Sequence, residues 1–199
     1  MAKPRPPLKG IDPLQIYMHA LGFHVSENAL GNLTLSQNTQ LGAQVVQATM
    51  VLSAFTTELF LKCLVCIETS LTPQGHHLFE LFEQITPITQ DKIIHLWDTQ
   101  IIPHRDPEWK FIESKQYSGD RKFSRDLPGA LSDSSRAFEQ IRYSYEPNCK
   151  EADFNIIDMP RVLRRVILEM KPAWADLGRD VKPVPGFSRD QKRKPPGGD

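Results

Sequence analysis

The chain has 199 residues, enough for one domain with a buried core, and its 24 basic and 24 acidic residues give a formal net charge of zero. This balance does not favour a strongly basic nucleic-acid-binding protein, although it allows a local basic patch. Three cysteines, an odd number, do not indicate a disulfide scaffold. The N-terminal stretch is charged and lacks the apolar segment of a secretory signal, so we expect a cytoplasmic protein.

Both ends of the chain are predicted to be flexible. Residues 1–13 hold four prolines and four charges, which is typical of a poorly ordered arm. Residues 179–199 combine six basic and three acidic residues with four prolines and three glycines, as in a mildly basic disordered tail. A phosphate contact by the basic run at 192–194 is the lesser alternative. The predicted folded domain covers residues 14–178.

The first half of this domain predicts two helices. Residues 11–24 indicate one short helix. Residues 36–69 indicate a long central helix, because apolar residues recur at steps of three and four with a second apolar row beside them. At 1.5 Å per residue this helix is roughly 50 Å long. Residues 28–57 carry no formal charge, but their scattered Asn and Gln amides would be costly in lipid, so we expect no membrane span.

The second half predicts shorter helices separated by breaks that contain proline or glycine. These helices cover residues 77–85, 87–101, 126–145 and 156–177. The third begins at Asp126, a residue type that caps helix N-termini, with Pro128 in its first turn. Residues 103–126 are polar and irregular, and predict a long connection after a helix stop at Pro103. Because strand-like alternation is nowhere sustained, the predicted fold is all-α.

The sequence Cys63-Leu64-Val65-Cys66 has the spacing of a redox pair. A redox pair works at a helix N-terminus, where exposed amides lower the thiol pKa, whereas this one lies deep in the long helix. We therefore interpret both cysteines as core residues. A zinc site that adds His76 and His77 is the alternative, but its spacing matches no zinc finger. The GxGxxG, GxxxxGK[ST], G-x-S-x-G and H-E-x-x-H motifs are absent, and we expect no metal and no cofactor.

Three polar places occur where helices should pack. Glu58 and Lys62 lie four residues apart in an apolar segment, which indicates either a routine helix-stabilising pair or a polar site inside the core. The adjacent histidines His76 and His77 form the second place. The third is RYSYE at 142–146, where an arginine and two tyrosines either complement a helix C-terminus or form a surface for a nucleotide or RNA.

Together these places resemble the HEPN family (higher eukaryotes and prokaryotes nucleotide-binding). The chain shows AFTTELFLKCL at 54–64, GHHLFELFEQI at 75–85 and IRYSYE at 141–146, in the order of the blocks of that family. The resemblance spans about residues 40–175. The residues that match its polar positions are Glu58, Lys62, His77 (with His76 as the alternative), Arg142, Tyr143 and Glu146.

The resemblance implies an up-and-down bundle of four to five helices that usually dimerises. Many members are metal-independent endoribonucleases in toxin–antitoxin or phage-defence systems, and others only bind nucleic acid, nucleotides or proteins. The ribonucleases carry an R-x(4–6)-H pair. This chain has none, because Arg5 is the sole arginine before its last histidine, His104. We therefore expect a non-catalytic homodimer that binds RNA or a nucleotide, together with a partner protein encoded nearby.

In this leading interpretation Lys62, Arg142 and Tyr143 line the ligand cleft. The first alternative is an endoribonuclease in which His77 acts as acid or base and Arg142 holds phosphate, which requires that the two meet in space. The second alternative is a structural or adaptor dimer without a nucleic-acid ligand, whose polar residues serve only helix packing.

Overall fold

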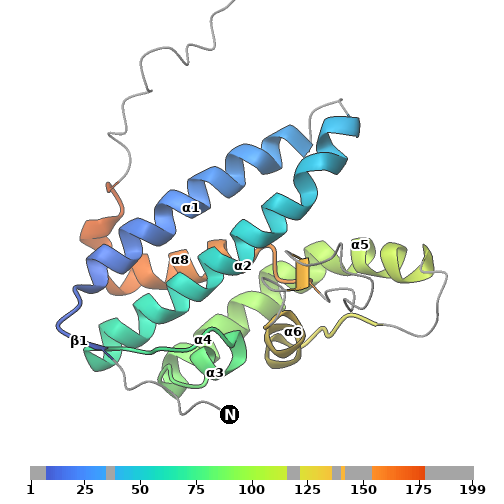
Figure 1. Cartoon of the computed structure of the whole chain (residues 1–199). Helices are drawn as coiled ribbons and strands as arrows, with labels where there is room; N and C mark the ends of the chain where they lie inside the picture. Colours follow the sequence, from blue (N-terminus) through green and yellow to red (C-terminus); the bar gives the residue numbers. More distant parts are fainter. Residues whose placement is uncertain (1–7, 35–38, 116–121, 136–139, 142–153, 178–199) are drawn as a thin grey trace, which may run out of the picture.

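Helices account for nearly all of the ordered architecture. The computed structural model describes residues 8–34, 39–115, 122–135, 140–141 and 154–177, with backbone alone for 33–34 and 39–44. Within these residues, Figure 1 shows the helices α1 (Pro13–Thr34), α2 (Thr39–Thr69), α3 (Leu78–Phe82), α4 (Pro87–Leu96), α5 (Ile102–Lys115), α6 (Leu127–Ser134) and α8 (Met159–Met170). The predicted all-α fold, built around one long helix, is confirmed.

Short irregular elements complete the fold. A π-helical turn, Trp97–Ile101, joins α4 to α5, and a 3-10 turn, Pro172–Trp174, follows α8. The two-residue strands β1 (Leu8–Lys9) and β2 (Leu71–Thr72) pair antiparallel. β1 belongs to the arm that was predicted to be flexible. Its pairing with β2 holds the last part of the arm next to the end of α2.

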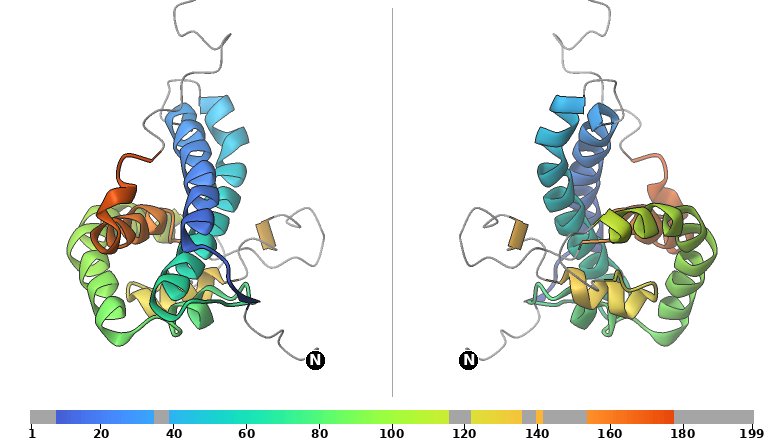
Figure 2. Two further views of the ribbon diagram at one scale, coloured as in Figure 1. Left: turned by 90° about the vertical axis from the view of Figure 1, so that its left-hand side faces the viewer. Right: turned by 90° about the vertical axis from the view of Figure 1, so that its right-hand side faces the viewer.

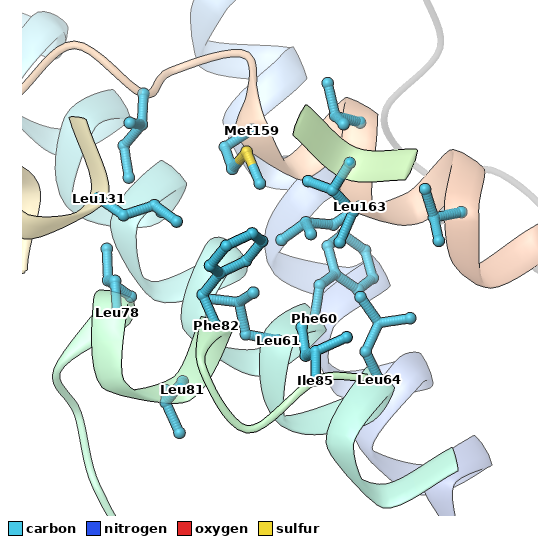
Figure 3. Close-up of a cluster of buried hydrophobic side chains, with 14 of the residues drawn as sticks. Phe60, Leu61, Leu64, Leu78, Leu81, Phe82, Ile85, Leu131, Met159 and Leu163 are labelled. Carbon is cyan, nitrogen blue, oxygen red and sulfur yellow. The ribbon is translucent and has the colours of Figure 1, made fainter. Parts of the chain in front are cut away.

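The helices α1 and α2 form a long antiparallel hairpin, and the other helices gather around one half of it. Figure 2 shows that the far half of the hairpin rises clear of the remaining helices. The main core surrounds the C-terminal half of α2 and is drawn in Figure 3. Its buried side chains come from α2, α3, α6 and α8 and include Phe60, Leu61, Leu64, Leu81, Leu131 and Leu163.

The segment Val45–Thr69 of α2 is long and apolar enough to cross a membrane, with a mean hydropathy of 1.8. In the structure, 61% of its most apolar stretch is buried within the protein itself. A helix at the centre of a core has the same composition, because it is apolar on most of its circumference. The packing thus accounts for the hydropathy of α2, and the absence of a membrane span stays a prediction.

The predicted short helix at 11–24 is too short, because α1 continues to Thr34. Tertiary packing explains the extension. The ring of Phe23 lies 4.7 Å from that of Phe55 on α2, edge to face, and Glu27 further along α1 is buried. A helix that lies along a partner gains stability beyond its intrinsic propensity.

The predicted stop at Pro103 and the predicted irregular connection at 103–126 are wrong for the first part of that segment. The chain is helical without a break from α4 through the π-helical turn into α5, and Pro103 is the second residue of α5. The indole rings of Trp97 and Trp109 stack 6.1 Å apart and hold the turn and α5 together. The helix therefore continues through the proline.

Ion pairs of Arg125 hold the end of the 103–126 segment against α5. Arg125 donates from Nη1 to Glu113 Oε1 at 2.7 Å and from Nε to Asp106 Oδ1 at 2.9 Å, and its guanidinium lies 5.2 Å from the ring of Trp109. The hydrogen bond from Arg125 lowers the pKa of the Glu113 carboxyl. Trp97 Nε1 donates to the carbonyl of Arg125 at 2.8 Å.

The last two predicted helices are correct in place and partly correct in extent. Asp126 caps α6, because its Oδ1 accepts from the backbone N–H of Gly129 at 2.8 Å. α6 ends at Ser134, whereas the predicted helix continues to Tyr145; residues 136–139 and 142–145 of that continuation lie outside the described part of the chain. α8 covers the middle of the predicted 156–177 helix and ends at Met170, because Lys171 precedes a proline and leaves the helical conformation.

Candidate functional site

One buried carboxylate on α2 accepts hydrogen bonds from a lysine and a histidine. Glu58 Oε1 lies 2.8 Å from Lys62 Nζ and 3.0 Å from His76 Nδ1. The side chains of Glu58 and Lys62 are 8% and 13% exposed, whereas that of His76 is 84% exposed. We call these three residues the Glu58 cluster. It extends from the packed face of α2 to the protein surface.

The partners of Glu58 explain how the core tolerates its charge. A buried ion costs several kcal/mol of desolvation unless charged or hydrogen-bonding partners compensate for it. Lys62 supplies a full positive charge one helical turn away, and the loop before α3 supplies the imidazole of His76. An ionised carboxylate only accepts hydrogen bonds, so the Nδ1 of His76 carries the proton that is donated to Glu58.

The two adjacent histidines have different environments. His76, the alternative match to the histidine of the motif, contacts Glu58, and no such contact is made by His77 in the described part of the chain. His77 is the residue before α3, and its Nδ1 is buried without a hydrogen-bond partner in the described part of the chain. Because neighbouring side chains in an extended segment point to opposite sides, His76 and His77 face in different directions.

The third block of the motif, apart from Ile141, lies outside the described residues. Arg142, Tyr143 and Glu146 all belong to the segment 142–153, so their positions relative to the Glu58 cluster are not defined. Ile141, directly before them, is buried. The structure therefore brings together the first two blocks, through Glu58 and His76.

The cysteines face another part of the core. Cys63 Sγ lies 3.4 Å from the carbonyl oxygen of Pro13, and Cys66 Sγ lies 3.5 Å from that of Ile11. Burial, with a smaller contribution from Cys66, raises the pKa of Cys63 to about 12, so its thiol is a poor nucleophile. Their interpretation as core residues is confirmed. Within the described residues, no three His, Cys, Asp or Glu side chains are grouped to hold a metal ion.

Sequence reasoning missed a second polar site, a cavity of about 400 Å³ between the hairpin and α5. Glu27, Arg105 and Asp158 are among its lining residues, and none of them was a candidate. One signal was present in the sequence, because Glu27 is the sole formal charge between residues 13 and 57. An isolated charge in such a stretch indicates either a partner that compensates for it or a functional role.

Comparisons with protein-family models, with curated proteins and with solved structures found no match to this chain. The resemblance to the HEPN family therefore stays a prediction, and it depends on the residues of the three blocks.

We predict that the Glu58–Lys62 pair contributes much more to stability than an exposed pair with the same spacing. Glu58→Gln should lower the free energy of unfolding by about 3 kcal/mol, because Lys62 then keeps its charge in a nearly buried site. The double variant Glu58→Gln/Lys62→Met should lose less than the sum of the two single variants, with a coupling above about 1 kcal/mol in urea unfolding.

Arg165→Met is the matched control for this cycle. Arg165 pairs with Glu169 at the same i, i+4 spacing at 3.2 Å, but the two side chains are 54% and 38% exposed. The control should change stability by no more than about 0.5 kcal/mol. Equal small losses for both pairs, or strictly additive effects in the cycle, would contradict a buried, coupled pair.

Proposed function

We propose that this chain is a HEPN-like helical binding module, non-catalytic, whose ligand is a phosphodiester in the form of RNA or a nucleotide. One observation carries the proposal. Lys62 from the first block and His76 from the second meet at the same oxygen of Glu58. Residues that matched the polar motif positions thus form one cluster, although they belong to separate elements.

The chemistry of the cluster suits an anion at its outer edge. Glu58 is the buried residue of the cluster, and the positive charge of Lys62 compensates for its negative charge. His76 stands in solvent at 84% exposure, and in its protonated form the imidazolium donates from Nε2 to an anion. In the proposal, Arg142 holds phosphate by charge-assisted hydrogen bonds and Tyr143 stacks on a base. Both of these residues lie beyond the described segments.

Metal-independent ribonuclease activity is the second candidate function, and the environment of His76 favours it. A carboxylate bonded to Nδ1 orients an imidazole and leaves Nε2 as a proton acceptor, as in many acid–base sites. The buried, unpartnered Nδ1 of His77 suits that task less well. Within this candidate, His76 therefore takes the role first given to His77, and Arg142 again holds the phosphate.

We also propose that the module is a cytoplasmic homodimer that acts with a partner protein encoded nearby, in a toxin–antitoxin or phage-defence system. The homodimer is supported by the exposed face of α1. Met18 and Val25 lie two turns apart and are 43% and 60% exposed, with Gly22 between them. Identical copies of a charge-free face can pack without like-charge repulsion.

Binding of a labelled single-stranded RNA, measured by fluorescence anisotropy in EDTA, tests the proposed function. Arg142→Ala should weaken binding about tenfold or more, because a charge-assisted contact to phosphate is lost. The exposed Arg161→Ala control should bind like the wild type. Unchanged affinity in Arg142→Ala, or no binding by the wild type, would contradict the proposal, and the latter result favours an adaptor.

The RNA recovered from the same reactions distinguishes the two candidate functions. We expect it to be intact. Cleavage that His76→Ala abolishes and the surface variant His19→Ala retains would instead establish the ribonuclease.

Sedimentation of Val25→Glu tests the dimer. A charge at the centre of the α1 face should give monomers, because two copies would bury like charges against each other. Ile88→Glu is the control, since Ile88 is 84% exposed on α4, away from this face. A monomeric wild type, or a Val25→Glu variant that stays dimeric, would contradict the proposed surface.

A further inference from the structure

The last part of the N-terminal arm lies over the two buried cysteines of α2. We call residues 8–13 the strap, which consists of β1 and the turn into α1. Cys63 Sγ donates to the carbonyl of Pro13 at 3.4 Å, and Cys66 Sγ donates to that of Ile11 at 3.5 Å. In Figure 1 the strap runs from the start of α1 to β1, beside the C-terminal end of α2. Both thiols are therefore in direct contact with one short segment.

The pairing that holds the outer end of the strap is short. It consists of two residue pairs, Leu8 with Thr72 and Lys9 with Leu71. Leu8 is 47% exposed, and Lys9 and Gly10 are exposed as well. A segment with few buried contacts opens locally at a lower free energy than the whole fold. The strap is thus a thin cover that can open while the helices stay packed.

A glycine lets the strap turn between β1 and α1. Gly10 has a φ of 77°, in the left-handed region that favours glycine. A Cβ atom added at this position would meet no other atom within 4 Å. A β-branched residue at position 10 therefore strains the backbone of the strap without a clash against α2. Such a variant acts on the strap alone.

The closed strap keeps the thiols unreactive. Cys63 and Cys66 are 0% and 2% exposed, and their three-residue spacing puts both on one face of α2. Burial is the main cause that raises the pKa of Cys63 to about 12, and the interaction with Cys66 adds to it. Opening of the strap brings water to both sulfur atoms and removes part of this burial. The thiolate, which is the reactive form, then forms more readily.

We propose that Cys63 and Cys66 form a dithiol that a small disulfide, such as oxidised glutathione, oxidises when the strap opens. The thiolate of one cysteine attacks a sulfur of the small disulfide, which forms a mixed disulfide and releases one reagent thiol. The second cysteine attacks the protein sulfur of that mixed disulfide and releases the other reagent thiol. The protein loses two electrons and two protons, and the two released thiols carry them.

Oxidation changes both the strap and α2. A disulfide has no S–H group, so the hydrogen bonds to the carbonyls of Ile11 and Pro13 are lost and the closed strap is weakened. Residues three apart on a helix have Cβ atoms roughly 5–6 Å apart, whereas a disulfide holds them about 4 Å apart. The disulfide therefore tightens one turn of α2. The dithiol acts as a redox-sensitive latch for the N-terminal arm.

The rate at which N-ethylmaleimide labels the two cysteines, measured by mass spectrometry of the full chain, tests the strap. Cys149→Ser removes the third cysteine in every protein compared. Gly10→Val should raise the rate at both cysteines about tenfold, because the strained backbone favours the open strap. Gly22→Val makes the same change in the helical backbone of α1, also in open space, and should leave the rate unchanged. Equal rates in Gly10→Val and in the parent protein would overturn the proposal.

The urea dependence of this rate separates strap opening from global unfolding and needs no change in the strap. Strap opening exposes little surface, so the rate should stay nearly constant at low urea and rise only near the unfolding transition. A rate that rises steeply from the first addition of urea would show that only global unfolding exposes the thiols. That result would overturn the proposal.

Incubation with oxidised glutathione tests the dithiol. The expected product is a protein lighter by two hydrogen atoms, formed faster in Gly10→Val than in the parent protein. Cys66→Ala should instead stop at the mixed disulfide on Cys63. A mixed disulfide that persists when both cysteines are present, or no oxidation of Gly10→Val, would overturn the proposal. These experiments omit RNA, so their outcome is independent of the phosphodiester proposal.

Discussion

The burial of one carboxylate, Glu58, constrains the rest of the structure. A helix that is apolar on most of its circumference can hold an ion only where partners reach it. Lys62 meets this need from within α2, and His76 does so from the loop before α3. The contact between His76 and Glu58 also fixes the path of that loop. The pairing of β1 with β2 holds the chain just before the loop. The contacts of Glu58 with Lys62 and His76 therefore link the stability of the fold to the position of the exposed His76 imidazole.

The long helix α2 has different surroundings in its two halves. Its C-terminal half is packed by several helices and contains the Glu58 cluster and the buried cysteines. Its N-terminal half lies mainly along α1 and leaves Val46 45% exposed. Residues 39–54, which form this half, carry no formal charge. Ser53 in this half donates a hydrogen bond to the carbonyl of Ile157 at 3.2 Å, which joins α2 to the segment before α8.

Local signals in the sequence predicted the features that depend on neighbouring residues. The cap at Asp126, the length of α2 and the Glu58–Lys62 pair all follow from short spacings. Features that depend on distant partners were not predictable. The continuation of the chain through Pro103 requires the π-helical turn and the stacking of two tryptophans, and the choice of His76 over His77 depends on the path of a loop. The cavity was missed because Glu27, Arg105 and Asp158 come from three separate segments.

The central claim is that the Glu58 cluster lies at the ligand site, and amide and side-chain NMR shifts on titration with a short single-stranded RNA test it most directly. We expect the largest shifts on Lys62, His76 and residues 142–146. Shifts confined to the basic tail at 179–199, with the cluster unaffected, would contradict it.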